Sequence, residues 1–136
     1  MSELPEQSDR PLGEVLAEQF DLVSAFLDAL PYAVVVVDET GRINRVNEEA
    51  ELLFGYHRNL MLGKAVEMLV PDGVRDKHPT LREGYMANPV LRPMGVSVEV
   101  RARRKNGSEL PVLISLKPCI TVAGTYVVAA VQRKSG

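Results

Sequence analysis

The sequence predicts a single α+β domain in which most strands pair as antiparallel hairpins. Three observations lead to this prediction. Residues 12–30 carry apolar side chains at the spacing of an amphipathic helix, whereas residues 33–46 and 96–117 each contain two strand-like runs joined by turn residues. The chain has 136 residues, with 46% hydrophobic and 25% charged side chains, which is the size and balance of one globular domain.

Residues 1–10 are polar and are predicted to be a disordered lead-in, followed by a helix over residues 11–30 that ends before Pro31. Its apolar positions recur at steps of three and four: Leu12, Leu16, Phe20, Val23, Leu27 and Leu30. Val15, Leu22 and Phe26 widen this apolar face beyond what one flat contact requires. We therefore expect the helix to pack against the domain and a second chain together. The expected dimer interface consists of Leu16, Phe20, Val23 and Leu27.

The first hairpin is predicted from "AVVVVDETGRINRV", with a turn at residues 38–41 and a second strand around residues 43–46. Both faces of the first strand are apolar, so each face needs a cover, and the leading helix is the nearest cover for the outer face. Asn47 is predicted to cap the next helix, which runs to about Phe54 and stops at Gly55.

The middle of the chain is predicted to be helical but broken. Residues 56–70 form short helical pieces interrupted at Gly63, with Val66, Met68 and Leu69 as core contacts. A longer helix is predicted over residues 72–88, where four side chains share one face: Val74, His78, Leu81 and Tyr85. Pro79 cannot donate a backbone hydrogen bond, so the helix is expected to restart there with His78 just outside it.

The last third of the chain carries the clearest strand pattern. Residues 96–102 alternate apolar valines and alanine with polar side chains, and "KNGS" supplies the Asn-Gly pair that favours a tight hairpin. In the return strand Val112, Ile114 and Leu116 are expected to face inward. After a turn at residues 123–124, "TYVVAAVQ" is apolar on both faces and is therefore predicted to be central or covered.

Composition excludes several classes of function. The net charge of -2 gives no electrostatic reason to expect nucleic acid as a direct partner. Cys119 is the sole cysteine, which rules out an internal disulfide, a zinc cluster or a redox pair and fits a reducing cytoplasm. No apolar run is long enough for a membrane span, and the polar N-terminus does not resemble a secretory signal. No nucleophile motif, phosphate loop or metal-ligand spacing is present, so no enzyme activity is expected.

Residues 28–133 resemble the PAS family of sensory domains. "AVVVVDETGRINRVNEEAELLFGY" looks like the opening hairpin and Asn-capped helix of that family, and "RRKNGSELPVLISLKP" is similar to its signature hairpin. The resemblance implies a five-stranded antiparallel sheet in the order 2-1-5-4-3, with the helical middle crossing one face around a cavity. It also implies that the leading helix is the N-terminal cap through which many such domains dimerise.

The same resemblance limits the choice of cofactor. Flavin photoreceptor relatives need a cysteine in the helical middle, and none occurs between residues 56 and 90, so flavin photochemistry is not expected. Haem-binding oxygen-sensor relatives ligate iron through a histidine on the helix that would carry His78, and neutral imidazole suits that role. On the opposite wall, however, Val98 and Val96 stand where those relatives place an arginine or a methionine, and Met94 is a poor substitute. We therefore favour a packing or capping role for His78, and a surface role for His57.

The predicted function is that of a cytoplasmic sensory domain that binds a small ligand or partner and relays the change through a homodimer to an output domain. A histidine kinase or a transcription regulator is the expected output, outside the residues given. The ligand stays unknown; a haem sensor using His78 and a ligand-free interaction module are the alternatives. The candidate binding residues are His78, Leu81, Tyr85, Arg92, Val96, Val98, Val100, Ile114 and Val127. The basic run Arg101, Arg103, Arg104 and Lys105 is interpreted as the solvated face of a hairpin.

Overall fold

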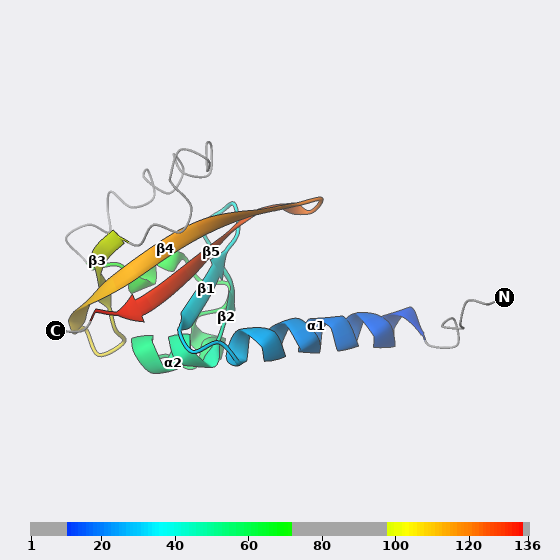
Figure 1. The fold of residues 1–136 in the computed structure, drawn as a ribbon, viewed down its shortest axis with the longest axis horizontal. Helices are drawn as coiled ribbons and strands as arrows, with labels where there is room; N and C mark the ends of the chain where they lie inside the picture. Colours follow the sequence, from blue (N-terminus) through cyan, green and yellow to red (C-terminus); the bar gives the residue numbers. More distant parts are fainter. Residues whose placement is uncertain (1–10, 72–97, 135–136) are drawn as a thin grey trace.

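A computed structural model describes residues 11–71 and 98–134 of the protein (Figure 1). A helix and a hairpin open the described chain: α1 (Leu12–Asp28), β1 (Ala33–Val37) and β2 (Ile43–Val46). Three short helices follow, namely α2 (Glu48–Phe54), η2 (Arg58–Leu60) and η3 (Val66–Leu69). The last strands are β3 (Val98–Arg103), β4 (Glu109–Thr121) and β5 (Gly124–Arg133).

The five strands form one antiparallel sheet in the order β2-β1-β5-β4-β3, which confirms the predicted fold. The last strand is central, as its apolar character on both faces predicts. It pairs with β1 from Ala33–Val131 to Val37–Val127, and with β4 along its whole length. Because β4 and β5 are longer than β1, their hairpin continues past the end of β1 (Figure 1).

Local sequence explains why the turns lie where they do. In the β1–β2 turn, the Asp38 carboxylate accepts hydrogen bonds from the Thr40 hydroxyl at 2.7 Å and from the amides of Thr40 and Arg42, and Gly41 has a positive φ of 86°. Burial alone would raise the pKa of Asp38, but these donors outweigh it and lower the pKa. In the β3–β4 turn, Gly107 has the same φ but Asn106 has no positive φ, so the left-handed glycine follows a turn closed by the Gly107 amide on the Arg104 carbonyl at 2.9 Å rather than a two-residue type I′ turn.

The core lies between one face of the sheet and the helices α2, η2 and η3. Its members are Ala33, Val35, Val37, Ile43, Val46, Ala50, Phe54, Met61, Leu69, Ala102, Leu110, Val112, Ala129 and Val131. Val66, Met68, Ile114 and Leu116 are partly buried against this core. The predicted inward positions of the return strand and the core contacts of the middle segment are therefore confirmed.

Helix α1 extends away from the body rather than lying along the sheet (Figure 1). The C-terminal end of α1 and the residues after it reach the outer face of β1, where Leu27 and Leu30 line a hollow beside the buried Val34. Leu22, Val23 and Phe26 remain 49%, 41% and 65% exposed. The helix is expected from sequence to cover the outer face of the first strand. The last turn of α1 does so, whereas the rest of the helix points away from the sheet (Figure 1).

Candidate functional site

The wall of the predicted cavity is the core face of β3, β4 and β5. Val98 pairs with Ile114 across β3 and β4, Val100 pairs with Val112, and Val127 lies on the same face of β5. Val112 is 1% exposed and Val127 is 6% exposed, whereas Val100 is 40% exposed. Among the described residues, Val112 and Val127 are therefore buried on this face, whereas Val100 stays exposed.

Several predicted site residues lie outside the described residues: His78, Leu81, Tyr85, Arg92 and Val96. The predicted helix over residues 72–88 and the first two residues of the predicted strand at 96 lie there as well. The described structure brings Ile114 and Val127 together on one face, with Val98 and Val100 in register beside them.

Sequence reasoning missed Met61, which is 0% exposed and belongs to the core. The run Leu60-Met61-Leu62 is apolar throughout, so no periodicity distinguishes the buried position from its neighbours, which are 48% and 38% exposed. The segment after Met61 is fixed along β2 by backbone bonds, from Gly63 to the Ile43 carbonyl and from Ile43 to the Lys64 carbonyl, both 2.8 Å. Met61 thus packs into the core from the helical side, opposite the sheet.

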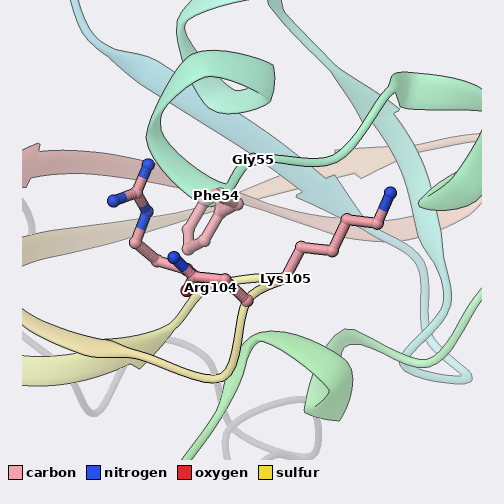
Figure 2. Close-up of a pocket in the computed structure, with 5 residues that line it drawn as sticks. Phe54, Gly55, Arg104 and Lys105 are labelled. Atoms are coloured by element: carbon pink, nitrogen blue, oxygen red, sulfur yellow. The ribbon is translucent and has the colours of Figure 1, made fainter.

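A shallow hollow of about 360 Å³ lies between the end of α2 and the β3–β4 turn (Figure 2). It is lined by Phe54, Gly55, Arg104, Lys105 and Asn106. The side chains of Arg104 and Lys105 extend in opposite directions from Phe54, so their charges do not converge on one point (Figure 2). Arg104 Nε instead donates to the Leu53 carbonyl at 3.0 Å, and the Lys105 amide donates to the Phe54 carbonyl at 2.9 Å. These contacts satisfy carbonyls at the end of α2, a structural role that sequence reasoning did not assign to Arg104.

A second hollow of about 250 Å³ lies on the outer face of the sheet, beside the end of α1. Its lining is largely apolar and comes from α1, the residues after it and three strands: Leu27, Leu30, Tyr32, Val34, Ser115, Leu116, Lys117, Val128 and Ala130. Leu27, which sequence reasoning assigned to the dimer interface, is half-buried here within its own chain. The structure describes the backbone but not the side chains of α1 at Leu16 and Phe20.

Asn47 joins α1, β1 and α2. Its side chain is 0% exposed, and its Oδ1 accepts hydrogen bonds from the amides of Val34 at 2.9 Å and Ala50 at 3.0 Å. Its Nδ2 donates to the carbonyls of Leu27 at 2.7 Å and Tyr32 at 2.9 Å. The predicted cap of α2 is confirmed, and the same amide also holds the end of α1.

Arg58 makes a second connection between α1 and α2. Its NH2 lies 2.9 Å from Glu51 Oε1 and 3.1 Å from Asp28 Oδ1. The hydrogen bond from Arg58 is the main reason why the pKa of Glu51 is lowered. Asp28 Oδ1 also accepts from the amide of Glu48 at 2.8 Å, so one carboxylate contacts both the first residue of α2 and the residue that opens η2.

The described residues hold neither a metal-ligand cluster nor a membrane-spanning helix. Within residues 11–71 and 98–134, no three His, Cys, Asp or Glu side chains gather as metal ligands would. Over the same ranges, no helix has the length and apolar content needed to span a membrane. His57 is exposed, as expected, and its Nδ1 accepts from the Asn59 amide at 3.2 Å.

Comparison with protein families decides what kind of domain this arrangement is. The family model for the PAS domain matches residues 31–133, which is most of the chain and all five strands. The chain belongs to the PAS domain family. A solved structure with the same fold is the PAS domain of an HTR-like protein from Haloarcula marismortui, with a TM-score of 0.65 and 18% identity over 90% of this chain and 97% of that one.

Two curated relatives place this PAS domain among signalling proteins. The chain is 30% identical over 101 residues to the oxygen sensor protein DosP of Escherichia coli, a match that covers 74% of the chain and 13% of DosP. It is 29% identical over 103 residues to the cell-division control histidine kinase PdhS of Brucella anthropi, covering 76% of the chain and 10% of PdhS. The PAS domain thus spans about a tenth of the length of these relatives.

Proposed function

We propose that this PAS domain is a sensory module that binds an apolar or planar small molecule between its sheet and its helical middle, and that it controls a histidine kinase or transcription regulator. The observation that carries the proposal is the gradient of burial along the core face. Val112 is 1% exposed, whereas Val100, its partner on β3, is 40% exposed. An apolar face that the described residues leave exposed at one end suits a guest that would cover it.

The relatives support the signalling part of the proposal. Their names include an oxygen sensor and a histidine kinase, and each is far longer than the matched region. A sensory domain of this kind is expected to act on an output domain. It can do so only if the bound molecule favours one of two conformations of the domain over the other. We place it in the cytoplasm, as the lone exposed Cys119 favours.

Native mass spectrometry of gently purified protein tests the proposal, with two valine variants as a matched pair. Val100→Lys places a charge at the open end of the apolar wall, so a co-purifying small molecule should be lost. Val122→Lys places the same charge at the fully exposed tip of the β4–β5 turn, so the molecule should be retained. A spectrum of the parent protein without any bound mass would contradict the ligand-binding proposal.

Haem is the second candidate ligand, and the similarity to the oxygen sensor DosP favours it. In this alternative His78 would supply the imidazole ligand to the iron. The test is the ultraviolet-visible spectrum of protein produced with haem available. A Soret band that disappears in His78→Ala and persists in His57→Ala would establish haem and replace our preference for a haem-free guest. A spectrum without the band would exclude this alternative.

A ligand-free interaction module is the third candidate, and the exposed apolar edge of α1 favours it. Leu22, Val23 and Phe26 remain exposed in the single chain. Val23 lies one helical turn before Leu27, which lines the second hollow, so these three side chains form an apolar edge of α1 next to that hollow. We propose that this edge is the dimer contact, because half-buried Leu27 is engaged within its own chain. A dimer together with a clean apo spectrum would support this module over the ligand sensor.

A further inference from the structure

Helix α1 is attached to the body at one end. It has 17 residues, so it is about 25 Å long at 1.5 Å per residue. Its first residue, Leu12, is 72% exposed. At the other end the Leu27 carbonyl accepts from Asn47, the cap of α2, and Asp28 contacts Glu48 of α2 and Arg58, which opens η2. A change of 10° at the attached end would therefore move the free end by roughly 4 Å.

The last residue of α1 is unfavourable for the helix itself. Asp28 lies in the final turn, where the helix dipole favours cations, and that turn contains no basic residue. Its carboxylate is instead compensated by other elements, since it accepts from the Glu48 amide at 2.8 Å and from Arg58 at 3.1 Å. The negative charge of Asp28 is thus stabilised by groups of α2 and η2, and not by α1 itself.

Arg58 adds a side-chain bridge to this attachment, beside the bonds that Asn47 and the Glu48 amide make to the end of α1. Its guanidinium bridges Asp28 and Glu51, and its own amide donates to Glu51 Oε2 at 2.7 Å. The three side chains are 20% to 34% exposed, so they are partly screened from water. A half-buried bridge with two carboxylates on one guanidinium has a defined geometry that a fully exposed pair lacks.

The same residue is connected to the core through its backbone. The Arg58 carbonyl accepts from the amide of Met61 at 2.9 Å, and the Met61 side chain is 0% exposed in the core. A shift of η2 caused by a change around Met61 would therefore move Arg58. Such a shift would change the distance between Arg58 and Asp28.

We propose that Arg58 is a positioning residue that holds α1 in a fixed orientation, and that displacement of η2 from the core releases this hold. The inference goes beyond the proposed function, because it concerns how α1 is held and not what the cavity binds. It applies equally to a domain without a ligand. The consequence is that the core can change the direction of α1 without any contact between α1 and the cavity.

The test measures distances between spin labels at Leu12→Cys and Gln132→Cys in a Cys119→Ser background. Both labelled residues are exposed, one at the free end of α1 and one on β5. Labelled protein is diluted with excess unlabelled protein, so that distances within one chain dominate. Arg58→Gln should broaden the distribution, by roughly 4 Å for each 10° of added freedom of α1. Asp28→Asn, which leaves the Arg58–Glu51 pair intact, should broaden it in the same direction.

Arg101→Gln is the matched control, because it removes an exposed arginine–glutamate pair on β3 and β4, far in sequence from α1. It should leave the distribution unchanged, and circular dichroism would verify that each variant is folded. An unchanged width in folded Arg58→Gln and Asp28→Asn, or equal broadening in Arg101→Gln, would overturn the proposal.

The link to the core has its own variant. Met61→Leu nearly conserves side-chain volume, so the domain is expected to stay folded, and it changes the shape of the core side chain that directly follows η2. With Arg58 intact, it should still shift or broaden the distribution. An unchanged distribution in Met61→Leu would show that Arg58 holds α1 without responding to the core.

Discussion

Asn47 illustrates how one buried polar residue can serve several elements. Its side chain has two acceptor positions and two donors in use, and all four partners are backbone groups of α1, β1, α2 and the residue before β1. A buried amide is stable only when its groups are paired, and here each is paired. The residue therefore stabilises the junction as well as the helix that it caps.

Asn47→Ala should destabilise the domain strongly. The substitution removes four hydrogen bonds and leaves buried backbone groups without partners, so a loss of about 2 to 4 kcal/mol in the free energy of unfolding is expected. Urea denaturation measures this loss as a lower midpoint at an unchanged dependence of the free energy on urea concentration. Asn59→Ala, at an exposed position, should change the free energy little; similar losses in both variants would contradict the role given to Asn47.

Glu51 makes the free energy of unfolding of the domain depend on pH at the acidic end of the range. Its hydrogen bond with Arg58 lowers the pKa of Glu51 below the ordinary 4.5, so the folded state binds fewer protons than the unfolded state. This stabilisation is present above pH 4.5 and is lost as the pH falls through the folded pKa. Denaturation measured from neutral pH downward should show a shallower decline in Glu51→Gln than in the parent. Parallel curves would show that the pair contributes nothing.

At the scale of elements, α2 ends because Gly55 adopts a left-handed conformation. Its φ is 81°, and its amide donates to the Glu51 carbonyl at 2.8 Å. An added Cβ would lie 3.8 Å from Lys105 Cβ, which is an ordinary contact. The cost of a side chain at Gly55 is therefore conformational rather than steric.

Gly55→Ala should lower the free energy of unfolding by about 1 to 2 kcal/mol, the cost of a left-handed conformation for a residue with a Cβ. Gly13→Ala is the matched control, since Gly13 lies in the first turn of α1 with open space around it. That change should be neutral or stabilising by up to about 1 kcal/mol, because alanine favours a helix. Equal losses in thermal or urea denaturation would exclude the conformational explanation.

At the scale of the whole molecule, the exposed apolar edge of α1 is the feature that a single chain leaves uncovered. Phe26→Asp should weaken a dimer formed through this edge by placing a charge in an apolar contact. Leu52→Asp on α2 is the matched control, because Leu52 and Phe26 are each 65% exposed. Sedimentation velocity over a range of concentrations measures the association. A dimer that survives Phe26→Asp, or that weakens equally in Leu52→Asp, would exclude this interface.

The strands could be predicted from sequence because their signals are local. The run Val34-Val35-Val36-Val37, the turn at Gly41 and the Asn-Gly pair before Ser108 fix strand type and turn position within a few residues. The order of the five strands came from the family resemblance, and the antiparallel sheet confirms it. The burial of Met61 could not be predicted, because both of its neighbours are equally apolar.

The sequence by itself determined which segments become strands, where they turn and which helix Asn47 caps, because these depend on neighbours a few residues apart. Only the tertiary structure decided that Arg58 contacts Asp28, that Arg104 contacts the end of α2, and that Leu27 faces its own sheet while Phe26 does not. The first two contacts join residues 30 and 51 positions apart in the chain, and the third depends on the direction of α1. Local preference carries no information about such distant pairs, since packing of whole elements brings them together.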